Sequence, residues 1–172
     1  MHRMKRLLLL SLVFAAACSD QPTKEESVRV FGTASVSLST AQANAVTAAK
    51  TGGDSADVTL NYTGACALGG SVSVNGNYAG DGNDERAAFD LTAAFAGCKD
   101  LSGSLDGDIH WTSTADAAGF SAAMTGTLDW QSGNDSATCD FDLHLAVTQT
   151  AITYGGSLCG YTMAELGISV GN

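Results

Sequence analysis

The feature that most constrains the fold of this chain is the alternation of apolar and polar residues from position 58 onward. A period of two places every apolar side chain on one face of a β-strand. Short segments rich in Gly, Asp, Asn and Ser separate the runs, as in hairpins between antiparallel strands. The sequence therefore predicts an all-β domain, an antiparallel meander of about eight strands that forms a β-sandwich or a small barrel. The alternating apolar residues are Val58, Leu60 and Tyr62; Val72, Val74 and Tyr78; Phe89, Leu91, Ala93 and Phe95; Leu105, Ile109 and Trp111; Phe120, Ala122, Met124, Leu128 and Trp130; and Cys139, Phe141, Leu143, Leu145 and Val147.

The stretch before these runs is predicted to add one strand and one short helix. Residues 40–50 are rich in Ala, lack the alternation and precede Gly52 and Gly53, which indicates a short helix. Because Ala buries little area, such a helix would depend on contacts with the sheet. Residues 28–38 alternate and predict a first strand, with apolar side chains at Val28, Val30, Ala34, Val36 and Leu38.

The first 17 residues have the composition of an export signal. Basic Arg3, Lys5 and Arg6 precede an apolar run of about ten residues, which is too short to span a bilayer. Residues 1–17 are therefore predicted to be a signal peptide that is removed from the mature protein.

The end of this segment reads Ala-Ala-Cys and resembles the lipobox of bacterial lipoprotein precursors, although that family most often has Leu where this chain has Ala15. The resemblance covers the export segment only. It implies that Cys18 becomes the first residue, that its sulfur is acylated, and that the lipid anchors the protein in the cell envelope. In the best-known lipoprotein systems, an uncharged residue such as Ser19 favours the outer membrane. Ala15 and Ala17 also form an A-x-A cleavage site, so simple secretion is the alternative.

The chain after the export segment is strongly acidic. Residues 18–27 are polar, include Pro22, and are predicted to form a flexible tether, whereas residues 28–172 form one disulfide-stapled domain. The mature chain holds 18 acidic and five basic residues, a formal charge of −13. This charge would repel phosphate backbones, so we expect no nucleic-acid partner. Contact with the membrane is expected through the lipid anchor, and an envelope protein or a glycan is the expected class of partner.

Five cysteines in an exported chain leave one over when the others pair. If Cys18 carries the lipid, the remaining four form an even set, and an oxidising compartment favours two structural disulfides over a metal site. Cys66 and Cys98 follow alternate strands and so reach the same end of a meander, while Cys139 opens one strand and Cys159 closes the next. Of the three connectivities, this order favours Cys66 with Cys98 and Cys139 with Cys159.

The segment 81–85 resembles the start of a calcium-binding loop, since oxygen-bearing side chains fall at alternate positions. However, Arg86 stands where such a loop needs Gly, and Thr92 stands where it needs a bidentate Glu. The Gly, Asp and Asn residues are sufficiently explained by the chemistry of a hairpin turn.

Two histidines, His110 and His144, fall on the polar faces of their strands. Turns near Ala115 and Asn134 would place them two strands apart and offset by about four residues along the strand direction. The two histidines would then be on the order of 17 Å apart, which is too far for one zinc ion. We therefore expect both to be surface histidines.

Six aspartates are expected on the same polar face, where two carboxylates could in principle serve a glycoside hydrolase, but nothing selects a pair. Trp111 and Trp130 fall on apolar faces of neighbouring strands, which favours core packing over a carbohydrate platform. The aspartates are Asp90, Asp106, Asp108, Asp129, Asp140 and Asp142.

The function expected from these features is that of a lipid-anchored envelope module that binds a partner or has a structural role. No catalytic residue, metal ligand or cofactor is predicted. One alternative is a carrier of a small ligand or carbohydrate, if the strands close into a barrel with a lumen under the two tryptophans. The other is an exported hydrolase that uses the clustered aspartates.

Overall fold

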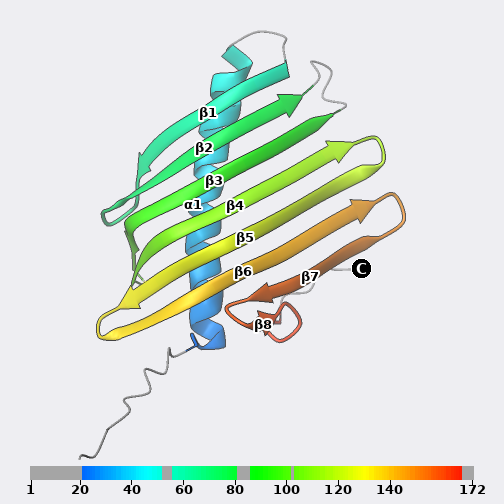
Figure 1. Ribbon diagram of the computed structural model, residues 1–172. Coiled ribbons are helices and arrows are strands. Elements are labelled where there is room, and N and C mark those ends of the chain that lie inside the picture. Colours follow the sequence, from blue (N-terminus) through cyan, green and yellow to red (C-terminus); the bar gives the residue numbers. More distant parts are fainter. Residues whose placement is uncertain (1–20, 52–55, 81–85, 102, 168–172) are drawn as a thin grey trace, which may run out of the picture.

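One helix lies against one eight-stranded sheet in the part of the chain that the computed structural model describes, residues 21–51, 56–80, 86–101 and 103–167 (Figure 1). The helix is α1 (Lys24–Thr51). The strands are β1 (Ala56–Ala65), β2 (Ser71–Gly80), β3 (Ala87–Asp100), β4 (Gly103–Asp116), β5 (Gly119–Ser132), β6 (Asp135–Thr148), β7 (Ile152–Leu158) and β8 (Tyr161–Thr162).

The strands form an antiparallel meander, as predicted. Each strand pairs with the next along the chain, so the order in the sheet is the order of the sequence. Among the described residues β1 and β8 form the two edges, and the sheet is open rather than closed into a barrel. The layer that packs against one face of the sheet is α1, which crosses behind the strands in Figure 1.

Alternate side chains of the sheet point toward α1 and form the core, which gives the sheet a buried inner face and an exposed outer face. This arrangement explains the period of two in the sequence, because only one face of each strand is covered. The buried inner positions of the sheet are Leu60, Val72, Val74, Leu91, Ala93, Phe95, Cys98, Leu105, Ile109, Leu128, Trp130, Cys139, Phe141, Leu143 and Leu158.

The strand predicted over residues 28–38 is wrong, because these residues lie within α1. Val30, Ala34 and Leu38 are four residues apart, which brings them onto one face of a helix, and each is at most 3% exposed. The other two apolar positions of the apparent alternation lie on other faces of the helix and are exposed. We call the three residues, together with the buried Ser27, the buried stripe of α1.

The helix is also longer than predicted. It has 28 residues, where the sequence indicated a short helix over 40–50. It begins at Lys24, so residues 24–27 of the predicted tether are helical, and Pro22 just before the helix is buried against the domain.

A capping box fixes the start of α1. The backbone N–H of Thr23 and its Oγ1–H both donate to the Glu26 carboxylate, at 2.7 and 2.8 Å. In return, the backbone N–H of Glu26 donates to Oγ1 of Thr23 at 3.2 Å. The two hydrogen bonds from Thr23, the backbone one first, lower the pKa of Glu26.

We expect Thr23→Ala to lower the free energy of unfolding by about 1 kcal/mol at neutral pH, because the hydroxyl serves both directions of the capping box. Since the pKa of Glu26 is lowered by folding, its contribution is present above the ordinary carboxyl pKa and is lost as the pH falls through the lowered value. Urea denaturation at neutral pH and at about pH 3 would check this, with a smaller difference between variant and wild type expected in acid. Equal stability of the two proteins at neutral pH would contradict the capping role.

Candidate functional site

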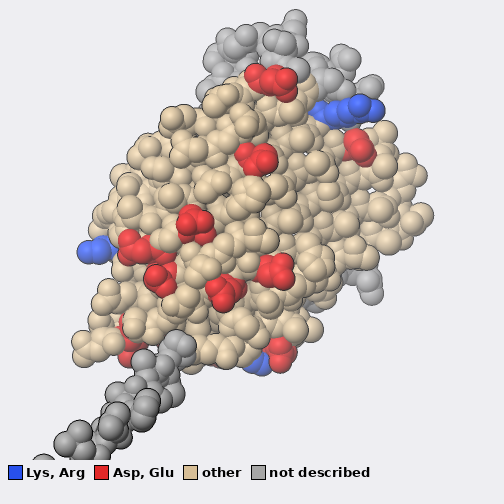
Figure 2. Space-filling model, in the orientation of Figure 1, with Lys and Arg blue, Asp and Glu red and all other residues tan. Residues whose placement is uncertain are grey.

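The outer face of the sheet, which points away from α1, carries the six aspartates singled out in the sequence. All six are exposed, as expected. Acidic side chains are scattered over this face in Figure 2, whereas the basic side chains in view lie at its margins. Four of the aspartates are engaged by neighbouring groups, which is the usual role of cross-strand pairs. Asp90 lies 2.7 Å from Nε2 of His110, Asp106 accepts from the Gly97 N–H at 2.7 Å, Asp129 accepts from Thr138 Oγ1 at 2.7 Å, and Asp140 accepts from Thr127 Oγ1 at 2.8 Å.

The two histidines lie on this outer face but are not brought together. The register aligns His110 of β4 with Thr125 of β5 and then with Asp142 of β6, two residues from His144. The two histidines are therefore offset by two residues along the strand direction rather than the predicted four, because the β4–β5 turn lies at residues 117–118 and not near 115. Two strands and two residues correspond to about 12 Å, still too far for one zinc ion.

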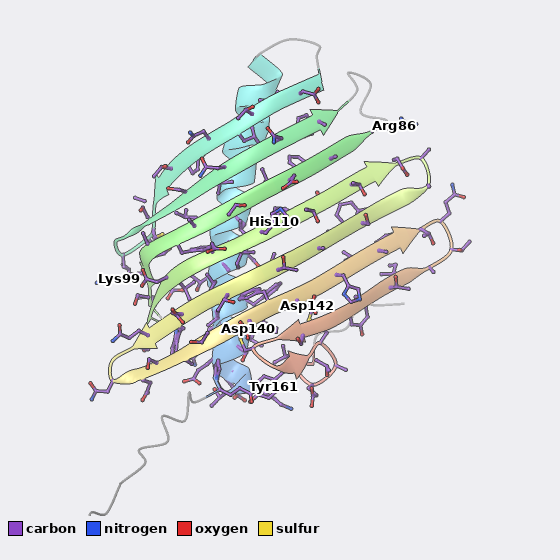
Figure 3. The ribbon with its side chains drawn as sticks, in the orientation of Figure 1. Arg86, Lys99, His110, Asp140, Asp142 and Tyr161 are labelled. Atoms are coloured by element: carbon purple, nitrogen blue, oxygen red, sulfur yellow. A yellow bond between two sulfur atoms is a disulfide. The ribbon has the colours of Figure 1, made fainter. Side chains whose placement is uncertain are left out.

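No group of three His, Cys, Asp or Glu side chains that could hold a metal ion occurs in the described ranges. Figure 3 shows His110 near the middle of the sheet and Asp140 and Asp142 on β6, away from it. The segment 81–85, which resembles the start of a calcium loop, lies outside the described residues.

Two disulfides join the four cysteines of the domain in the predicted pairs. Cys66, in the turn after β1, is bonded to Cys98 of β3, and Cys139 of β6 is bonded to Cys159, which follows β7. The first bond ties the β1–β2 turn to β3 beside an irregularity in the β3–β4 register. The second ties the last strands to the place where the N-terminal end of α1 docks.

A groove of about 770 Å³ opens beside α1 at the end of the sheet that holds the first disulfide. We call it the α1–β1 groove. Its helix wall consists of residues spaced three and four apart, which share one face of α1 next to the buried stripe. That wall is formed by Arg29, Gly32, Thr33 and Val36, and the remaining lining includes Tyr62, Val72, the Cys66–Cys98 disulfide, Lys99, Asp100 and Leu101.

Glycines allow the β1–β2 turn to close over the end of β3 and complete this groove. Gly70 has φ +77°, and a Cβ there would collide with the backbone carbonyl of Gly97. The turn is further held by two backbone hydrogen bonds to Lys99: its N–H donates to Gly69 O at 2.8 Å, and its carbonyl accepts from Leu68 N at 3.0 Å. Gly69 and Gly70 therefore allow the turn to lie against β3, where its residues 65–67 line the groove.

The apolar lining of the α1–β1 groove reaches the surface of the molecule. Val36 of α1 is 67% exposed, and Leu101, at the end of β3, is 97% exposed. Apolar side chains this exposed, beside a concave apolar surface, are typical of a place where a partner or ligand binds.

The described lining of the α1–β1 groove holds more basic than acidic residues, whereas the chain as a whole is strongly acidic. Arg29 and Lys99, two of the eight basic residues of the chain, line it. Asp100 is the one acidic residue in the described lining, and its carboxylate accepts hydrogen bonds from Thr33 Oγ1 and from the Gly103 N–H. A strongly acidic protein thus has a net positive charge at this groove.

A second hollow, of about 310 Å³, lies beside α1 on the other side of the buried stripe. Phe31 of α1 and Trp111 of β4 border it, and nearly all of its lining is apolar. Trp130 is buried in the core and Trp111 packs against that core, so the predicted core role of the tryptophans is confirmed. The open sheet has no lumen beneath them.

Sequence analysis did not find the α1–β1 groove, because its helix wall lies in the segment 28–38 that was interpreted as a strand. The signal that could have found it is the T-x-x-E sequence of Thr23 and Glu26, a helix-start pattern directly ahead of that segment.

No family model matches this chain, and neither a curated protein nor a solved structure is significantly similar to it. Within the described ranges, α1 included, no helix has both the length and the apolar character needed to cross a membrane. The interpretation of the groove therefore depends on its own geometry and chemistry.

Proposed function

We propose that the protein is a lipid-anchored module of the cell envelope that binds a ligand in the α1–β1 groove and is not catalytic. The observation that carries the binding role is the groove itself. Its volume of about 770 Å³ lies within the range of about 300–1,000 Å³ that is common for small-molecule sites. Its lining also has the composition of such sites, mostly apolar with a few charged side chains at defined places.

The way the chain enters the fold supports an anchor that holds the domain close to a membrane. Gln21 Nε2 donates to the Cys159 carbonyl at 2.8 Å and Pro22 is buried, so the domain holds the chain from residue 21 onward. Gln21 lies three positions after Cys18, a reach of about 10 Å when the chain is extended. Acyl chains on Cys18 would therefore keep the β7–β8 end of the domain at the membrane surface, and two disulfides suit an oxidising compartment.

We expect the wild-type protein, expressed in a bacterium, to be recovered in the outer-membrane fraction, and the Cys18→Ser variant to be recovered in the soluble fraction. The reason is that the serine hydroxyl removes the sulfur that the lipid would modify. Intact mass should show a wild-type chain that begins at Cys18 and carries acyl groups, with four further cysteines that react with a thiol reagent only after reduction.

A neighbouring substitution provides the control for this experiment. Ser19→Ala keeps Cys18 and an uncharged next residue, so it should fractionate with the wild type. If the wild-type chain is instead found unmodified in the soluble fraction, with a thiol that reacts before reduction, the anchor is contradicted and simple secretion is supported.

A further inference from the structure

We infer that the ligand of the α1–β1 groove is an anionic amphiphile with a single alkyl chain, a long-chain carboxylate. The alkyl chain would lie along the apolar lining, and the carboxylate would lie at Arg29 and Lys99. This inference rests on the proposed role of the domain as a binding module and specifies the class of ligand.

The apolar part of the groove fits one alkyl chain. The helix wall from Arg29 to Val36 extends about 10 Å along α1, and Tyr62 and Val72 face it from the sheet. A chain placed there would cover Val36 and Leu101, whose exposure to water is otherwise unfavourable. Val36 and Leu101 of the lining are exposed at the surface, so a flexible chain could enter the groove without any movement of the core.

The charged part of the groove favours an anionic head group. Within the described residues, no carboxylate lies within ion-pair distance of the Arg29 guanidinium or the Lys99 ammonium, although Arg29 is near enough to Glu26 to help lower the pKa of that carboxyl. Asp100, the nearby acidic residue, already accepts two hydrogen bonds from protein donors. Aspartates are scattered over the outer face of the sheet, so an anion would be repelled there, whereas Arg29 and Lys99 would attract it at this groove.

The binding test uses the Cys18→Ser protein recovered from the soluble fraction, which cannot be acylated and so needs no detergent. Isothermal titration calorimetry with decanoate, below the concentration at which it forms micelles, should show one site per chain. Decanol and decyltrimethylammonium are matched probes with the same alkyl chain and a neutral or positive head group. We expect decanoate to bind at least about tenfold more tightly than either, because of the three head groups only the carboxylate is an anion that can form ion pairs with the two cations.

Gly32 provides a test that separates binding from folding. A Cβ at this position meets no atom within 4 Å, so Gly32→Ala leaves the packing unchanged, and the side chain of Gly32→Leu would start from the same open position. Both substitutions improve helix propensity. Both variants should therefore melt no lower than the parent protein. The Leu side chain would occupy the groove and weaken decanoate binding at least about tenfold, whereas Ala should change it by less than about twofold.

The basic residues are tested by reversing their charge, and a charge reversal outside the groove is the control. The double variant Arg29→Glu with Lys99→Glu should weaken decanoate binding at least about tenfold and leave decanol binding nearly unchanged. Lys24→Glu is the control, because Lys24 lies outside the groove, with its Nζ 5.6 Å from the centre of the Tyr161 ring. It should bind decanoate like the parent protein.

Three results would overturn the inference: no binding of decanoate, equal affinity for all three head groups, or unchanged decanoate affinity in Gly32→Leu. The last would place the site elsewhere, for example in the hollow beside Trp111. Since the titrated protein carries no anchor, these results are independent of fractionation. If the wild-type protein is membrane-bound but its Cys18→Ser variant binds no amphiphile, the anchor is supported and the inferred ligand is wrong. If the wild-type protein is soluble and the variant binds decanoate, only the anchor is wrong.

Discussion

Val30→Asp is expected to lower the free energy of unfolding by at least about 3 kcal/mol, whereas Val28→Asp should change it by about 0.5 kcal/mol or less. Val30 is 1% exposed and belongs to the buried stripe of α1, so an aspartate there would place a carboxylate in the core without a partner. Val28 is 42% exposed, and an added negative charge in the early turns of a helix is favourable.

This pair of variants distinguishes a helix from a strand, because the substitutions are chemically identical and only two residues apart. In a strand the two valines would point to the same face and both changes would be severe. In α1 they lie about 200° apart around the helix axis. Urea denaturation of the two variants and the wild type gives the comparison. Comparable losses of stability in both would show that residues 28–38 are not packed as a helix.

The meander could be predicted because its strands have one covered face. In β3, for example, Leu91, Ala93 and Phe95 are buried, while Thr92 and Ala94 between them are exposed. The same rule makes β1 to β6 visible in the sequence, and glycine-rich or aspartate-rich turns separate most of them. The order of the strands and the two disulfide pairs followed from the meander alone.

The N-terminal segment could not be assigned by the same rule, because its residues satisfy two periods at once. Val30, Ala34 and Leu38 fit both a spacing of two and a spacing of four. Two exposed β-branched valines, Val28 and Val36, completed the apparent alternation and favoured a strand. Local preference was overridden by tertiary contact, since a helix lets the three buried residues pack together on the inner face of the sheet.

The candidate site depends on facts that the sequence does not contain. Arg29 and Lys99 line the same groove only because α1 crosses the inner face of the sheet. The direction of that crossing is set by packing between the helix and the sheet, not by any local pattern. The offset between the two histidines along the strands was predicted wrongly for a related reason. When a turn is placed two or three residues away from its true position, every residue pairing along that hairpin shifts.

Removal of either disulfide is expected to cost about 3–4 kcal/mol, the value for closing loops of this length in the unfolded chain. The sequence separations are 32 residues for Cys66–Cys98 and 20 for Cys139–Cys159, so the loop-closure contributions are nearly equal. The double Ala variants of each pair should therefore melt well below the wild type and close to each other. Thermal melting under non-reducing conditions would check this.

The two disulfides should nevertheless differ in their effect on ligand binding, because only one belongs to the α1–β1 groove. The Cys66–Cys98 bond holds the β1–β2 turn against β3 and forms part of the lining, so its loss should weaken decanoate binding even where the variant is fully folded. Cys139 and Cys159 lie outside that lining and tie β6 to the docking point of Gln21. Their removal should leave decanoate affinity unchanged at temperatures below the melting transition. If both double variants lost affinity equally, the groove would depend on the stability of the whole domain rather than on the turn that closes it.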